Sequence, residues 1–142
     1  MNYWVVDASV WVARLIPQDP FFAAAKTWFQ NQLSEGAIFL SPALLLAEVA
    51  GAISRRTCEA GLAQRAIDQI KSLPGLRLVE MDQTLVQAAA QMAAKLGLRG
   101  ADSFYVALAA QLKVTLVTLD KDQNERAAPV VAVHMLHEIN SF

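Results

Sequence analysis

The sequence predicts an α/β protein in which a mainly parallel β-sheet is covered by helices on both faces, giving three α/β/α layers. Short apolar segments alternate with longer segments whose apolar residues recur every three or four positions. Such alternation is typical of parallel sheets, because parallel strands need a long crossover between them. The chain has 142 residues, 55% of them hydrophobic, and we expect residues 1–142 to form one domain with a well-filled core.

The first elements follow from apolar runs and helix-start signals. Tyr3 to Val6 is expected to be a buried strand. Asp19-Pro20 predicts the start of a helix, with Asp as its cap and Pro in its first turn, and Gly36 predicts its end. A strand from Ala37 to Leu40 follows, and Ser41-Pro42 is expected to open the next helix in the same way.

The remaining elements continue the alternation. In the helix after Ser41-Pro42, one face collects Leu45, Glu48, Val49, Ala52 and Ile53. An amphipathic helix is predicted after Gly61, ending at Pro74-Gly75. The later elements are a strand from Leu76 to Val79, a helix from Met81-Asp82 to Gly97, a helix starting at Gly100, a strand from Thr115 to Leu119, a short helix or turn from Lys121 to Arg126, and a last strand from Val130 to Val133.

Four carboxylates, those of Asp7, Glu48, Asp102 and Asp120, lie inside or at the end of strongly apolar segments. A buried carboxylate is costly unless it is protonated, paired with a cation or bound to one. A hard divalent cation held by oxygen ligands supplies the missing positive charge most simply. Asp7 and Asp120 also end predicted strands, where open α/β sheets bind their ligands. We therefore predict a metal site that brings these acids together.

Charge and composition limit the possible functions. The net charge is −1, so the chain as a whole has no excess of positive charge for nucleic acid. Local basic residues would have to attract a polyanionic substrate, unless they are ordinary solvated helix-end charges; they are Arg14, Arg55, Arg56, Arg99, Lys121 and Arg126. There is no signal peptide or membrane-spanning run, and the single Cys58 forms no internal disulfide, so we expect a cytoplasmic protein.

The four acids stand in motifs that resemble those of a known family. In order they are Val5-Val6-Asp7-Ala8-Ser9, Ser41-Pro42 through Ala47-Glu48-Val49, Gly100-Ala101-Asp102, and Thr118-Leu119-Asp120. Across almost its whole length the chain resembles a PIN-domain ribonuclease, and in size and motif order a VapC-type toxin. Each motif alone is weak, whereas all of them in this order are specific.

The resemblance implies a PIN-like fold and a magnesium- or manganese-dependent endoribonuclease that a small antitoxin neutralises. It also implies a homodimer. The catalytic and metal-binding residues it implies, acting directly or through water, are Asp7, Glu48, Asp102 and Asp120. Ser9 and Thr118 would orient a carboxylate or a water.

Several alternatives remain open at this stage. Asp122 or Glu125 would add an acid to the site, although Asp122 also suits a helix cap. His134 and His137 lack a third metal ligand at suitable spacing and are expected at the surface beside the last strand. A non-catalytic PIN-like module and a receiver-like binding module are the rival functions. The receiver is disfavoured because Asp7 stands alone after the first strand.

Overall fold

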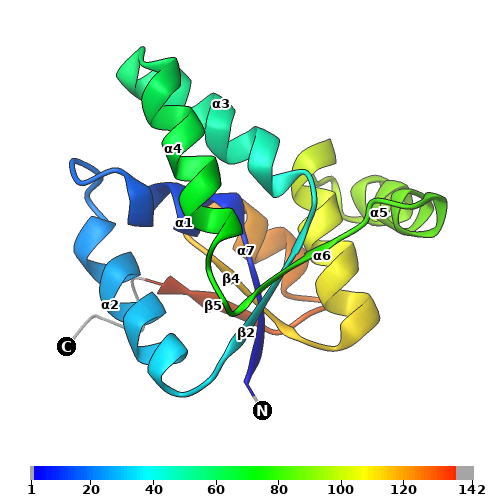
Figure 1. Ribbon diagram of the computed structural model, residues 1–142. Helices are drawn as coiled ribbons and strands as arrows, with labels where there is room; N and C mark the ends of the chain where they lie inside the picture. The colour runs from blue at the N-terminus through cyan, green and yellow to red at the C-terminus, as the bar shows by residue number, and fades with distance from the viewer. Residues whose placement is uncertain (1, 137–142) are drawn as a thin grey trace.

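The computed structural model describes residues 2–136, which form a five-stranded, all-parallel sheet in the order β3-β2-β1-β4-β5 (Figure 1). The strands are β1 (Tyr3–Val6), β2 (Ile38–Pro42), β3 (Leu76–Val79), β4 (Thr115–Thr118) and β5 (Val133–Met135). The chain adds β2 and β3 on one side of β1, then crosses to the other side for β4 and β5. This order confirms the predicted parallel sheet. It excludes a receiver-like fold, whose sheet has the order 2-1-3-4-5.

Helices cover both faces of the sheet. They are α1 (Ala8–Leu15), α2 (Phe22–Ser34), α3 (Leu45–Thr57), α4 (Ala60–Lys71), α5 (Gln83–Leu96), α6 (Gly100–Leu112) and α7 (Lys121–Ala127). Val6 and Val117 belong to a core with α1 to α4, whereas their neighbours Val5 and Leu116 belong to a core with α5, α6 and Ala127 of α7. Alternate strand residues thus face opposite layers. The three-layer architecture is confirmed, with α2 and the α5–α6 pair on opposite sides in Figure 1.

Aromatic side chains fill the core under α1 and α2. The ring of Trp11 lies 4.6 Å from that of Phe29, which lies 5.1 Å from that of Phe39. Trp11 and Phe29 are each only 3% exposed and Phe39 is fully buried. This packing fixes α1 against the sheet, and α1 begins directly after Asp7.

The sequence-based predictions differ from the structure at particular segments. Asp19-Pro20 does not open α2, which begins at Phe22 with Phe21 as its N-cap. Helix α1 was not predicted, because Val10 to Ala13 are all buried and show no amphipathic period. Ser41-Pro42 does not open a helix but ends β2, and α3 begins at Leu45. The pairing of β2 with β1 stops at Leu40, so Pro42 pairs with β3 alone and its missing N–H breaks no bond to β1.

The last strand also lies further along the chain than predicted. β5 starts at Val133, which pairs with Leu116 of β4, whereas Val130 and Val131 belong to the connection before it. These two valines pack against the core from that connection, so an apolar pair was mistaken for a strand. Within residues 2–136, no helix has both the length and the apolar character needed to cross a membrane.

Candidate active site

The acidic residues gather where the chain switches from one side of the sheet to the other. β1 and β4 are neighbours, and Val6 pairs with Val117. Asp7 follows β1 directly, with its backbone N–H donating to the carbonyl of Val117 at 2.9 Å. Asp120 follows β4. The carboxyl ends of strands at such a switch point are the usual ligand site of an open α/β sheet.

Asp7 is the most buried of the acids, with 4% of its surface exposed. Its Oδ2 accepts the backbone N–H of Ser9 at 3.1 Å and thereby caps α1. The Thr118 hydroxyl lies 3.3 Å from the same oxygen, and Gln123 Nε2 donates to Oδ1 at 3.3 Å. Burial nevertheless raises the pKa of Asp7, and the charge of Asp120 raises it further.

Glu48 reaches the site from α3. Its Oε1 accepts a 2.7 Å hydrogen bond from the hydroxyl of Tyr105 on α6. Burial raises the pKa of Glu48, and the charges of Asp7 and Asp102 add to this effect. The expected position of Glu48 on the apolar face of its helix is confirmed, since Leu45 and Val49 beside it are fully buried.

Asp102 and Asp120 share one cation, Arg99. The Arg99 Nε lies 3.3 Å from Asp102 Oδ2, and its Nη2 lies 2.8 Å from Asp120 Oδ2. Burial and the charge of Asp7 nevertheless raise the pKa of Asp102 to about 6. Because the Arg99 side chain is 72% exposed, solvent weakens its effect on the acids.

The four acids, called the acidic site below, therefore influence one another electrostatically. Asp7 raises the pKa of both Glu48 and Asp102, and Asp120 raises that of both Asp7 and Asp102. Asp120 has a structural role as well, since its Oδ1 accepts the Gln123 N–H at 3.2 Å and caps α7. The arrangement concentrates negative charge at the end of the sheet.

Sequence reasoning missed the residue that links several parts of the site, Gln123. It is fully buried, and its side chain contacts both Asp7, at 3.3 Å, and the Thr118 hydroxyl, at 2.6 Å. Thr118 in turn accepts the backbone N–H of Asp120 at 3.0 Å, and Ser9 Oγ accepts that of Leu119 at 3.1 Å. The only sequence signal for Gln123 is its place three residues after a helix cap.

The remaining candidates lie outside the acidic site. Asp122 is exposed and pairs with Arg126 at 2.9 Å on its own helix, whose cap is Asp120. Glu125 is exposed. His134 lies exposed on β5 with its ring 5.6 Å from that of Trp4, and His137 lies outside the described residues.

The chemistry of the acidic site fits a divalent cation. It offers carboxylate oxygens, which Mg²⁺ and Mn²⁺ prefer, and burial together with the neighbouring carboxylates raises the pKa of Asp7, Glu48 and Asp102. Within residues 2–136, no three His, Cys, Asp or Glu side chains are arranged to hold one ion directly. Mg²⁺ commonly keeps several waters and binds protein through one or two carboxylates, so the donor set suits an ion held partly through water.

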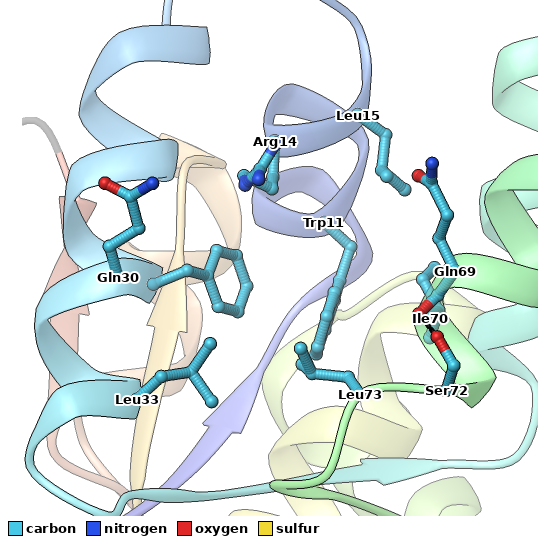
Figure 2. Close-up of a pocket in the computed structure, with 10 residues that line it drawn as sticks. Trp11, Arg14, Leu15, Gln30, Leu33, Gln69, Ile70, Ser72 and Leu73 are labelled. Atoms are coloured by element: carbon cyan, nitrogen blue, oxygen red, sulfur yellow. Dashed lines mark hydrogen bonds between the residues drawn. The ribbon is translucent and has the colours of Figure 1, made fainter.

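Two cavities border helix α1. One, of about 330 Å³, adjoins the acidic site between α1, the start of α2 and α3, and includes Glu48 and Ser9 in its lining. The other, of about 370 Å³, lies between α1, α2 and α4 (Figure 2). Trp11, Leu33 and Leu73 point toward one another in it, with Arg14 at its side, and none of the four acids lines it.

The fold and the position of the acids at the switch point define a PIN domain. Residues 4–129 match the family model for the PIN domain, and the chain belongs to this family. A search of curated proteins gave no match.

Solved structures with the same fold include toxins and toxin–antitoxin assemblies. VapC20 of Mycobacterium tuberculosis, described as a sarcin-ricin loop cleaving toxin, has a TM-score of 0.76 and 19% identity over 94% of this chain and 99% of its own. FitAcB of Neisseria gonorrhoeae has a TM-score of 0.69 and 21% identity over 94% of this chain and 98% of its own. VapBC2 of Rickettsia felis, solved with a promoter DNA fragment, has a TM-score of 0.71 and 14% identity over 93% of this chain and 97% of its own. At these identities the likeness establishes the fold.

Proposed function

We propose that the protein is a cytoplasmic, Mg²⁺- or Mn²⁺-dependent endoribonuclease and the toxin of a toxin–antitoxin pair. The observation that carries the proposal is the acidic site itself. Separate elements, β1, α3, α6 and β4, deliver one acid each to the switch point of the sheet, where burial and mutual repulsion raise the pKa of Asp7, Glu48 and Asp102. Membership of the PIN-domain family and the description of VapC20 as a sarcin-ricin loop cleaving toxin support it.

The side chains around the acids hold them for this role. A bound divalent ion would supply a nucleophilic water at neutral pH and stabilise charge on the phosphate. Asp7 is fixed by Ser9 and Gln123, and Glu48 by Tyr105. In this proposal Asp7, Glu48, Asp102 and Asp120 are the ligands, directly or through water.

The proposed partners are an RNA substrate, a small antitoxin and a second copy of the chain. A toxin–antitoxin complex from Klebsiella pneumoniae has the same fold, with a TM-score of 0.66, which supports the antitoxin. The homodimer is inferred from the resemblance to VapC-type toxins, and sedimentation velocity would test it. We expect the purified chain to sediment as a dimer, and a monomer at micromolar concentration would contradict this part of the proposal.

The direct test is cleavage of total RNA by purified protein in Mg²⁺ or Mn²⁺, beside a chelator control. Asp7→Asn should abolish cleavage, because it removes a ligand charge, while Asn still accepts the Ser9 N–H and keeps the cap of α1. Asp68→Asn on the exposed face of α4 is the matched control and should cleave normally. A correctly folded Asp7→Asn protein that cuts at the normal rate would refute the assignment.

A wild-type protein that cuts nothing calls for calorimetry with Mg²⁺ and Mn²⁺. Metal binding that Asp7→Asn abolishes would keep the metal site and direct attention to other RNA substrates. The absence of metal binding would favour the non-catalytic PIN-like binding module.

A further inference from the structure

The cavity of about 330 Å³ beside the acidic site joins an acid to a basic residue along one helix. Glu48, Ala52 and Arg55 follow one another on α3 at steps of four and three residues, and all of them line the cavity. Such steps keep side chains on one face of a helix. At about 1.5 Å per residue, the backbone of Arg55 lies roughly 10 Å beyond that of Glu48 along the helix axis. A ligand at the acids can therefore extend to the arginine.

The two arginines at this end of α3 differ in their partners. Arg56 Nη1 is held by Asp19 Oδ2 at 2.9 Å. Within the described part of the chain, Arg55 forms no ion pair. A Cβ placed on Gly51 would lie 3.1 Å from Arg55 Nη1, so the guanidinium rests over Gly51, one turn back toward Glu48. Arg55 thus directs an uncompensated positive charge toward the acidic site.

The other walls of the cavity suit a nucleotide. Ala8 and Ala52 are small, and Ser9 brings a hydroxyl from the first turn of α1, the helix that Asp7 caps. Phe21, just before α2, lines the opposite side and is 37% exposed. Proteins that bind single-stranded nucleic acid combine basic groups for the backbone with aromatic rings on which bases stack.

We propose that this cavity binds a segment of single-stranded RNA next to the phosphate that is cut, with Arg55 contacting a backbone phosphate and Phe21 stacking on a base. The inference rests on the proposed function and adds the surface that holds the substrate. Arginine suits the phosphate because its guanidinium donates two parallel hydrogen bonds to phosphate oxygens. The net charge of −1 makes such a local contact necessary, since the chain as a whole does not attract RNA.

The test measures binding of a fluorescein-labelled, mixed-sequence single-stranded RNA by anisotropy, in chelator so that no cleavage occurs, over a range of salt concentrations. Arg55→Ala should weaken binding about five- to tenfold and reduce the slope of log Kd against log salt by about 0.7. Phe21→Ala should weaken binding at least about fivefold, whereas Phe21→Tyr should retain it.

Arg65→Ala is a matched control. Arg65 Nη1 lies 3.6 Å from the position of a Cβ on Gly61, which is the same spacing on α4, but Arg65 does not line the cavity. The inference is overturned if Arg55→Ala and Arg65→Ala give the same affinity and salt slope, or if the wild-type protein binds no RNA. The cavity would then serve a protein partner or no ligand.

Cleavage kinetics separate this inference from the proposed function. In Mg²⁺ or Mn²⁺, Arg55→Ala should raise KM more than it lowers kcat, because it removes substrate binding away from the reacting bond. If wild type cuts RNA and Arg55→Ala cuts with unchanged KM, the proposed function stands and the RNA surface is wrong. If wild type neither cuts RNA with either metal nor binds Mg²⁺ or Mn²⁺, the proposed function itself fails.

Discussion

The hydroxyl of Tyr105 donates a 2.7 Å hydrogen bond to Oε1 of Glu48, which joins α6 to α3 across the acidic site. Burial raises the pKa of Tyr105, and the charge of Glu48 raises it further, so the hydroxyl keeps its proton and remains a donor. This bond lowers the pKa of Glu48 and so opposes the rise in pKa that burial causes. Tyr105 therefore helps to keep Glu48 ionised and in position.

Tyr105→Phe is expected to destabilise the protein by about 1–2 kcal/mol, because it removes a hydrogen bond to a charged group. It should also raise the pKa of Glu48, so that cleavage falls off at a higher pH than in wild type. Urea unfolding and a pH profile of kcat measure the two effects. Thr84→Val, which removes a hydroxyl at an exposed position of α5, is the control. Equal unfolding curves for the two variants would disprove the role of Tyr105.

Gln123 should matter more to stability than its polar character suggests. Gln123→Ala removes one buried hydrogen-bond partner from each of Asp7 and Thr118 and opens a cavity, so we expect a loss of about 2–3 kcal/mol in the free energy of unfolding. Gln91→Ala, at an exposed position on α5, should change it by less than about 0.5 kcal/mol. Urea denaturation compares them, and similar midpoints would show that the buried amide contributes little.

The stability of the metal-free protein should fall as pH rises. Asp102 has an ordinary pKa of 3.8 that the fold raises to about 6, so the folded state binds more protons than the unfolded chain between these values. Stability is therefore greatest below pH 3.8 as far as this group is concerned, and decreases as pH rises through about 6. Asp7 and Glu48, whose pKa values are also raised, act in the same direction.

Thermal unfolding in chelator at several pH values checks this expectation. After allowance for solvent screening, Asp102 should account for about 1 kcal/mol of the decrease in unfolding free energy with pH. Asp102→Asn should make the plot of unfolding free energy against pH flatter by that amount. A divalent ion bound to the carboxylates should remove the decrease, because it compensates the charge. An Asp102→Asn curve parallel to that of wild type would exclude Asp102 as the source.

Most of the fold followed from sequence patterns because its elements are separated by clear signals. Asp82 caps α5 through a 2.8 Å bond to the Leu85 N–H, and Gly97 ends that helix with a φ of 69°. Helix α1 offered no such pattern, since it is buried on several sides between the sheet, α2 and α3. A helix buried all round loses the polar face that makes the period visible.

The acidic positions were conspicuous in the sequence because each interrupts an apolar run, and the structure places all of them around the same strand ends. Ser9 and Thr118 were expected beside the acids, but the contacts of Gln123 and Arg99 with them were not predictable. Gln123 and Arg99 are ordinary residues for a helix start and a connection, and only the packing of α7 and α6 beside β4 and β1 brings them to the acids. Contacts between residues far apart in sequence leave no local signal.

Arg99→Ala tests whether the Arg99 guanidinium competes with a metal ion for the carboxylates of the acidic site. Its guanidinium lies between Asp102 and Asp120 and partly compensates their charge, in the place where a cation would be attracted. Arg99→Ala should therefore bind Mn²⁺ several-fold more tightly than wild type in calorimetry, because no internal cation has to be displaced, and Arg99→Lys should lie between them. Lys95→Ala, at an exposed position near the end of α5, is the control for loss of one positive charge at a distance. If Arg99→Ala binds Mn²⁺ with the affinity of wild type, the guanidinium does not compete with the metal, and its contacts serve to join α6 to the end of β4.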